Sequence, residues 1–172
     1  VFVAVSAVNS GPDAVTADHA SPWYTTVAAS TIPTYEGTVQ LPNGFEAAGA
    51  SVSVPFGETL TGPVVYSGDV AAAGAAPAEA ELCFPGTLDP AQVEGRIVVC
   101  DRGTNARVEK SEVVEAAGGI GMILVNVTPG SLDNDFHSVP TVHIDAQYRT
   151  ALLDYVRSTP DATATLVGDN VT

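Results

Sequence analysis

Basic residues are the scarcest feature of this sequence. Its 172 residues contain 6 Lys and Arg against 20 Asp and Glu, a formal net charge of −14, and no base precedes Arg96. Such a surface repels phosphate groups, so nucleic acid is excluded as a partner and anionic membranes are disfavoured. No apolar run approaches the roughly 18 residues of a membrane span. The chain opens on the apolar run Val1–Val5, and because a protein seldom starts in mid-strand, we expect a piece of a longer protein.

Cysteine is also scarce. Cys83 and Cys100 are the only two, too few for a four-ligand zinc site. Their spacing fits either two buried thiols or one disulfide. The low lysine content and the abundance of Ala, Gly, Thr and Val are typical of a secreted protein, in which a disulfide persists. We therefore expect a secreted chain with a Cys83–Cys100 disulfide, worth roughly 3 kcal/mol on the chain-entropy argument.

The first half of the chain has the pattern of antiparallel strands. Pro42-Asn43-Gly44 predicts a hairpin turn, and residues 51–54 and 64–66 predict two further strands. Residues 69–81 are rich in Ala, Gly and Pro, which predicts an exposed loop.

From residue 82 on, predicted strands alternate with helices. In order they are strand 96–100, helix 105–117, strand 121–125, strand 139–144, helix 146–157 and strand 162–167. Gly118-Gly119 ends the first helix, and Asp145 is a suitable N-cap for the second. The first three elements predict a parallel, right-handed βαβ unit. The fold class expected is α+β: a β-sandwich or barrel with two packed helices.

Two groups of motifs resemble one family. Ser6–Pro12 and Ala20–Ser30 resemble the segments that follow the oxyanion-hole strand of subtilisin-like serine proteases. The later motifs resemble the protease-associated (PA) domain inserted in these enzymes: Cys83, Gly86–Pro90, Val93–Cys100, Arg102-Gly103, Arg107–Lys110, Ala116–Leu124 and Asp135–Pro140. The resemblance is closest to plant cucumisin-like enzymes and related bacterial enzymes, and it covers about residues 1–167.

The resemblance implies a division into three parts. Residues 1–35 would be a fragment of the catalytic domain, residues 36–60 a connecting β-hairpin, and residues 61–168 the PA domain. The sequence motifs that carry the family's catalytic Asp, His and Ser are absent from this chain. It is then a non-catalytic module of a secreted endopeptidase, with no cofactor, that gates or shapes substrate access. Its implied partners are the parent's catalytic domain, a protein or peptide substrate, and a second copy in a homodimer.

Two rival interpretations remain. One is an autonomous peptide- or carbohydrate-binding domain unrelated to proteolysis, against which the catalytic-domain motifs in residues 1–35 argue. The other is a hydrolase acting alone through His19 or His137, against which the lack of a recognisable set of nucleophile, base and orienting group argues.

The resemblance assigns one catalytic role, to Asn9, whose amide would donate to the developing oxyanion of the intact enzyme. Val8 departs from the family, which usually has glycine there. Valine would narrow the specificity pocket, or it marks a sequence anomaly or a displaced strand. In the intact enzyme Val1–Val5 would lie inside a parallel sheet. Without the neighbouring strands of that sheet, the segment should exchange its amide hydrogens rapidly or pair with the same segment of another copy.

Other residues have competing explanations. Arg102, Arg107 and Lys110 form the only basic cluster, either a solvated helix face or a patch that docks an acidic surface. Asp133, Asp135 and His137 alternate as metal ligands do, but they lack the pattern of a calcium loop, and we expect no metal site. Asn126-Val127-Thr128 and Asn170-Val171-Thr172 are glycosylation sequons that we expect to be unused, because the composition looks bacterial.

Overall fold

A computed structural model describes residues 2–8, 19, 21–28 and 36–169 of the chain. The chain forms two compact units, Val1–Pro33 and Thr34–Thr172. In the first, β1 (Ala4–Ser6) pairs in parallel with β2 (Thr25–Val27). Among the described residues, β1 therefore has a paired strand, β2, on one edge within its own chain. The expectation that residues 1–5 exchange their amide hydrogens rapidly or pair with another copy did not include this pairing. Phe2 and Trp23 stay 78% and 77% exposed.

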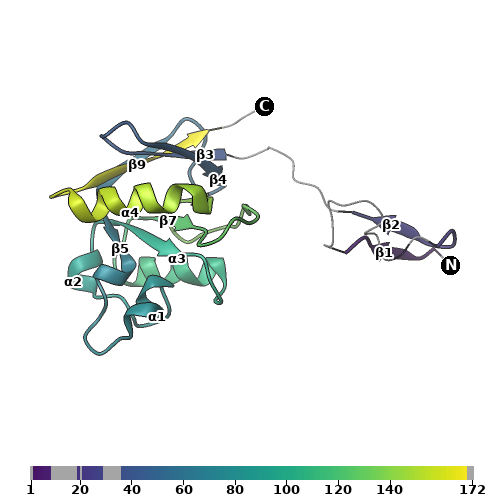
Figure 1. Ribbon diagram of the computed structural model, residues 1–172, viewed down its shortest axis with the longest axis horizontal. Coiled ribbons are helices and arrows are strands. Elements are labelled where there is room, and N and C mark those ends of the chain that lie inside the picture. The colour runs from purple at the N-terminus through teal and green to yellow at the C-terminus, as the bar shows by residue number, and fades with distance from the viewer. Residues whose placement is uncertain (1, 9–18, 20, 29–35, 170–172) are drawn as a thin grey trace. The chain divides into compact units, whose positions relative to one another are not determined.

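The described residues of the second unit form a closed barrel of seven strands (Figure 1). The strands are β3 (Glu36–Gln40), β4 (Glu46–Ala50), β5 (Thr59–Tyr66), β6 (Ile97–Asp101), β7 (Gly121–Val125), β8 (Thr141–Ile144) and β9 (Thr163–Asp169). Their order around the barrel is β3-β4-β8-β7-β6-β5-β9, and β9 pairs back with β3. Strands β5, β6, β7 and β8 run parallel to their neighbours in this series, and the other pairs are antiparallel.

Helices pack against the barrel. The α-helices are α1 (Pro77–Glu81), α2 (Pro90–Val93), α3 (Arg107–Ala116) and α4 (Arg149–Ser158), and the 3₁₀ helices are η1 (Ser67–Asp69) and η2 (Ala146–Tyr148). The predicted α+β class and the parallel βαβ unit, β6–α3–β7, are confirmed. At the end of α3, Gly118 has φ of 82°, and the N–H of Gly119 donates to the carbonyl of Val114, as in a Schellman motif. None of the described helices is long and apolar enough to span a bilayer.

The apolar runs of β6 and β7 are continuous because both faces of these strands are covered. Ile97 and Val99 of β6 belong to the cluster of buried residues that α4 also contacts. Val98 and Cys100, which alternate with them, belong to a second cluster that includes Val114 of α3. Strands buried on two faces lose the alternation of polar and apolar residues that marks a half-exposed strand.

The predictions of a strand at 51–54 and of a loop over the whole of 69–81 are wrong, and the hairpin around residues 42–44 is part of the barrel. Residues 51–54 form no strand, and 52–54 are bends, because hydroxyl groups replace the strand ladder. Ser51 Oγ donates to the carbonyl of Thr141 over 2.6 Å, and the N–H of Thr141 donates to Ser53 Oγ over 2.9 Å. Within 69–81, Pro77 begins α1, which buries Ala80. Strands β3 and β4, expected as a connection, occupy two places in the barrel wall.

Candidate functional site

The disulfide between Cys83 and Cys100 is present, as predicted. Its two Cα atoms lie 5.8 Å apart, and both cysteines are fully buried. Cys100 belongs to β6 in the barrel wall, whereas Cys83 lies just before residues 84–89, which have no helix or strand. The bond therefore fixes one end of this segment to the barrel wall.

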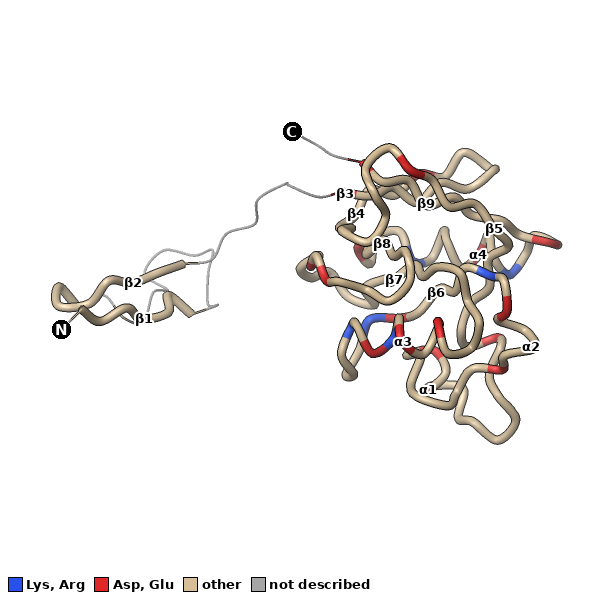
Figure 2. Tube along the Cα trace, turned by 180° about the vertical axis from the view of Figure 1, so that it is seen from behind, with Lys and Arg blue, Asp and Glu red and all other residues tan. Residues whose placement is uncertain are grey.

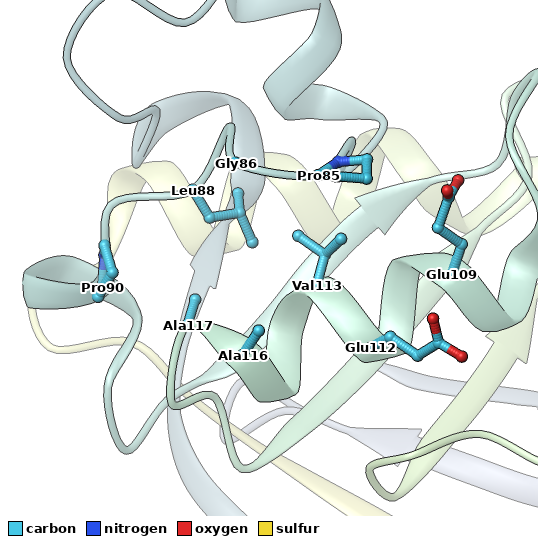
Figure 3. Close-up of a pocket in the computed structure, with 9 residues that line it drawn as sticks. All are labelled: Pro85, Gly86, Leu88, Pro90, Glu109, Glu112, Val113, Ala116 and Ala117. Carbon is cyan, nitrogen blue, oxygen red and sulfur yellow. The ribbon is translucent and has the colours of Figure 1, made fainter.

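A groove lies between the segment 85–90 and α3 (Figure 3). It has a volume of about 360 Å³ and is lined by Pro85, Gly86, Leu88, Pro90, Glu109, Glu112, Val113, Ala116 and Ala117. In Figure 3 the side chain of Val113 points toward Leu88, and the carboxylates of Glu109 and Glu112 lie at the end of the groove away from Pro90. The groove is thus apolar along most of its length and acidic at one end.

The face that α3 turns to the groove follows from its sequence. Residues 109, 112, 113, 116 and 117 have the i, i+3, i+4, i+7, i+8 spacing of one helix face. The buried face of the helix carries Lys110, Ser111 and Val114 instead. Because Ala116 and the neighbouring Ala117 are small, they leave room beneath the segment 85–90 that a larger side chain would fill.

The predicted basic cluster does not form a single surface patch. Lys110 is fully buried: its Nζ donates over 2.5 Å to both the carbonyl of Leu82 and Asn105 Oδ1. Burial, and then the charge of Arg102, lower the pKa of Lys110 to about 8. Arg102 donates to the neighbouring carbonyl of Gly103. Lys110 therefore ties α3 to the disulfide-linked segment and offers no charge to a partner.

Arg107, the third member, is an anchor for the loop that follows β7. Its guanidinium lies 2.9 Å from the carboxylate of Asp133 and also pairs with Asp135. The hydrogen bond from Arg107 lowers the pKa of Asp135. Figure 2 shows the few bases of this unit around α3 and α4, with acids spread more widely. Arg107, the one base of α3 that reaches the surface, is therefore already paired with two carboxylates.

His143 lies in the barrel wall, 1% exposed. Its Nε2 donates to Asn126 Oδ1 over 2.8 Å, and its Nδ1 accepts from the N–H of Asp133 over 3.2 Å. Burial lowers the pKa of His143 to about 4, so it is neutral at pH 7. Asn126 itself is 3% exposed, and its Nδ2 donates to the carbonyl of Ser131. A buried, bonded amide cannot accept a glycan in the folded chain, whereas Asn170 lies outside the described residues.

His137 contacts a serine without forming a reactive pair. Its Nδ1 lies 3.1 Å from Ser111 Oγ, the spacing of a base and a nucleophile. Ser111 is fully buried, however, and its hydroxyl donates to the carbonyl of Val108 over 2.7 Å. Among the described residues, no group of three His, Cys, Asp or Glu side chains could hold a metal. Asp133 and Asp135 bind Arg107 instead.

The first unit contains the remaining predicted residues. Asn9 lies outside the described residues. Val8 has φ of 60°, a left-handed conformation that glycine adopts without cost and that costs other residues about 1–2 kcal/mol. The departure from glycine therefore falls at a position where the backbone favours glycine. His19 Nδ1 lies 3.0 Å from the carbonyl of Ser6 in β1, and the carbonyl of His19 accepts from Thr26 Oγ1 in β2, so His19 connects the two strands.

Comparisons with known proteins agree on one family. A PA domain family profile matches residues 60–152. Subtilisin-like protease SBT1.4 of Arabidopsis thaliana is 39% identical over 169 residues, which cover 95% of this chain and 21% of that protein. Subtilisin-like protease SBT1.7 of the same plant is 38% identical over 172 residues, covering 96% and 22%. The chain spans about a fifth of the length of these curated relatives.

Solved structures share the fold at low identity. A zinc aminopeptidase from Bacillus subtilis superimposes with a TM-score of 0.56 at 22% identity, covering 83% of this chain and 32% of that one. The subtilisin-like protease Apa1 from the Antarctic psychrotroph Pseudoalteromonas sp. AS-11 gives a TM-score of 0.53 at 12% identity, covering 99% and 48%. The barrel is therefore a fold found in proteins of different chemistry.

The closed barrel with its flanking helices and the family match define the class. This chain belongs to the PA domain family. It matches plant subtilisin-like proteases over nearly its whole length.

Sequence reasoning missed the groove and the burial of Lys110. The spacing of Glu109, Glu112, Val113 and Ala116 was a usable signal for a second apolar face on α3. No signal in the sequence identified the carbonyl of Leu82 as the partner that makes burial of Lys110 tolerable, because that contact joins residues 28 apart.

Proposed function

We propose that this chain is a non-catalytic module of a secreted subtilisin-like serine endopeptidase. In this proposal the barrel shapes the access of substrate to the parent's catalytic domain and contacts protein or peptide segments or a second copy of itself. The observation that carries the proposal is the extent of the match. Similarity to SBT1.4 covers 95% of the chain, well beyond the PA region 60–152, as a PA domain with part of its host would.

The ends of the barrel support its role as an insertion. Strands β3 and β9 are antiparallel neighbours, and Glu36 pairs with Asp169. The chain therefore enters and leaves the barrel at adjacent points. A domain whose ends are close together can be inserted into a loop of another domain without separating the residues on either side. We propose that residues 36–60 and 61–168 together form this insertion.

Residues 1–35 then belong to the host. The parallel pair β1–β2 is a fragment of a sheet that the parent protein would complete, and the exposed Phe2 and Trp23 would be covered there. Within that sheet, Asn9 would supply the oxyanion donor. The donor has no function in this chain alone, since acyl transfer also requires a nucleophile and a base held beside it.

The chain by itself is expected to have no peptidase activity. Incubation with casein or with succinyl-peptide anilides should release no product above a blank, while a subtilisin run in parallel does. The reason is that the only close serine–histidine pair of the described residues, Ser111 and His137, has a buried hydroxyl bonded to a carbonyl. Hydrolysis that a serine-directed fluorophosphonate abolishes would overturn the proposal.

A further inference from the structure

We propose that the groove between the segment 85–90 and α3 binds an extended peptide segment with one bulky apolar side chain next to a Lys or Arg. This inference rests on the proposed function, because it names the class of segment that the barrel contacts. Neither the family match nor the predicted sites assign a role to this groove.

The apolar part of the groove is suited to one side chain. Its volume of about 360 Å³ is at the small end of the range for ligand sites, and Leu88, Val113 and Ala117 form its apolar surface. Leu88 and Ala117 are buried beneath the rim, whereas Val113 is half-buried. A leucine or phenylalanine placed there would remove apolar surface from water on both partners, which is the main favourable contribution to such contacts.

The acidic end selects the neighbouring residue. Glu109 and Glu112 lie one helical turn apart on the groove face of α3. Within the part of the chain that the structure describes, neither carboxylate forms an ion pair. The two bases of α3 are engaged elsewhere, Arg107 with Asp133 and Asp135 and Lys110 in the interior. A cation from outside would meet two carboxylates with no competing cation of the helix.

The groove is held open before any partner arrives. Its outer wall is fixed by the Cys83–Cys100 disulfide at one side and by α2 at the other, where the Asp89 side chain accepts from the N–H of Ala91. The N–H of Ala72 donates to the carbonyl of Thr87 over 2.8 Å and braces the segment from behind. A preformed site avoids the entropy cost of ordering a loop on binding.

The chain's own charges argue against a second copy as the occupant. Its net charge is −14, Lys110 is buried, and Arg107, Arg149 and Arg157 are each paired with carboxylates of the same barrel, so only Arg96 and Arg102 remain against the excess of acid. A second copy would bring further acid to an acidic groove. The charge therefore favours a partner segment of the opposite sign.

Amide chemical shifts of the ¹⁵N-labelled 172-residue chain test the proposal. The probe is the peptide acetyl-Gly-Leu-Lys-Arg-Gly-amide, compared with acetyl-Gly-Leu-Glu-Glu-Gly-amide. We expect the basic peptide to shift the amides of residues 86–89 and 109–117 in a saturable way, and the acidic peptide to have no effect. The double substitution Glu109→Gln/Glu112→Gln should weaken binding roughly five- to twentyfold, as two exposed ion pairs allow.

Two further variants make the result specific. Ala116→Phe, at an exposed position, should fill the groove and abolish binding. Glu115→Gln removes one carboxylate charge from α3 outside the groove, as each half of the double variant does inside it, and should leave the affinity within twofold of the parent chain's. The proposal would be overturned if millimolar peptide caused no chemical-shift change or if the acidic peptide bound equally well. It would also be overturned if Glu115→Gln lost as much affinity as the double variant, or if the chain self-associated through this face. None of these outcomes bears on whether the barrel shapes access in a parent protease, which a deletion tests separately.

Discussion

Replacing Arg149 by alanine is expected to lower the free energy of unfolding of the barrel by about 3 kcal/mol. Arg149 Nε donates over 2.9 Å and Nη2 over 2.6 Å to the carboxylate of Asp101, which is 3% exposed at the end of β6. The hydroxyl of Tyr66 donates to the same carboxylate over 2.9 Å. Burial and the Asp101 charge raise the pKa of Tyr66, so it stays protonated and can donate. Without Arg149, the carboxylate would remain buried with no ion-pair partner.

Arg157 of the same helix provides the matched control. It pairs with Asp69 over 2.7 Å, but both side chains are about half exposed, and its guanidinium lies over the Tyr66 ring. Arg157→Ala should therefore cost about 1 kcal/mol. Urea unfolding followed by circular dichroism measures both variants. If the two variants lost equal free energy of unfolding, the burial of Asp101 would not explain how much Arg149 stabilises the barrel.

The barrel should also lose stability as the pH falls from 6.5 toward 4. His143 has a pKa of about 4 in the folded chain against an ordinary value of 6.5, because burial disfavours its charged form. Between these values the unfolded chain takes up a proton that the folded chain does not, so acid favours unfolding. The loss expected from this group is about 3 kcal/mol across the window. Burial also lowers the pKa of His137, which acts in the same direction.

Comparison with two variants isolates the contribution of His143. Urea unfolding at several pH values should show a much weaker pH dependence for His143→Gln than for the parent chain. His19→Gln, at an exposed position, should leave the dependence unchanged. A His143 ring that titrates near pH 6.5 by NMR, or a His143 variant with the same pH dependence as the parent chain, would contradict this interpretation.

The fold could be predicted well wherever its signals are local. The Pro42-Asn43-Gly44 turn and the Gly118 helix end are found where the sequence placed them. Asp145 caps a helix as predicted, but that helix is the 3₁₀ helix η2, and α4 begins only at Arg149. Each depends on residues within a few positions of one another. The βαβ unit follows from the same kind of signal, because two apolar strands around one helix leave few ways to pair.

The contacts that the sequence did not predict join distant residues. Residues 51–54 were predicted as a strand from their local pattern. In the structure, the hydroxyls of Ser51 and Ser53 bond the backbone of Thr141, about 90 positions away, and no strand forms there. Lys110 had the pattern of a surface cation, and a carbonyl at Leu82 makes its burial possible. Hydrogen bonds of this kind depend on tertiary structure that local patterns do not encode.

Deletion of the barrel from a longer parent protein tests the central proposal most directly. Because Glu36 pairs with Asp169, a short Gly/Ser linker can replace residues 36–169. If the barrel shapes access, hydrolysis of a short peptide anilide should stay close to the parent protein's rate. The rate and pattern of cleavage of a folded protein substrate should change by more than the rate on the peptide anilide does. Unchanged rates on both substrates, or an equal fall on both, would contradict a role for this PA domain in substrate access.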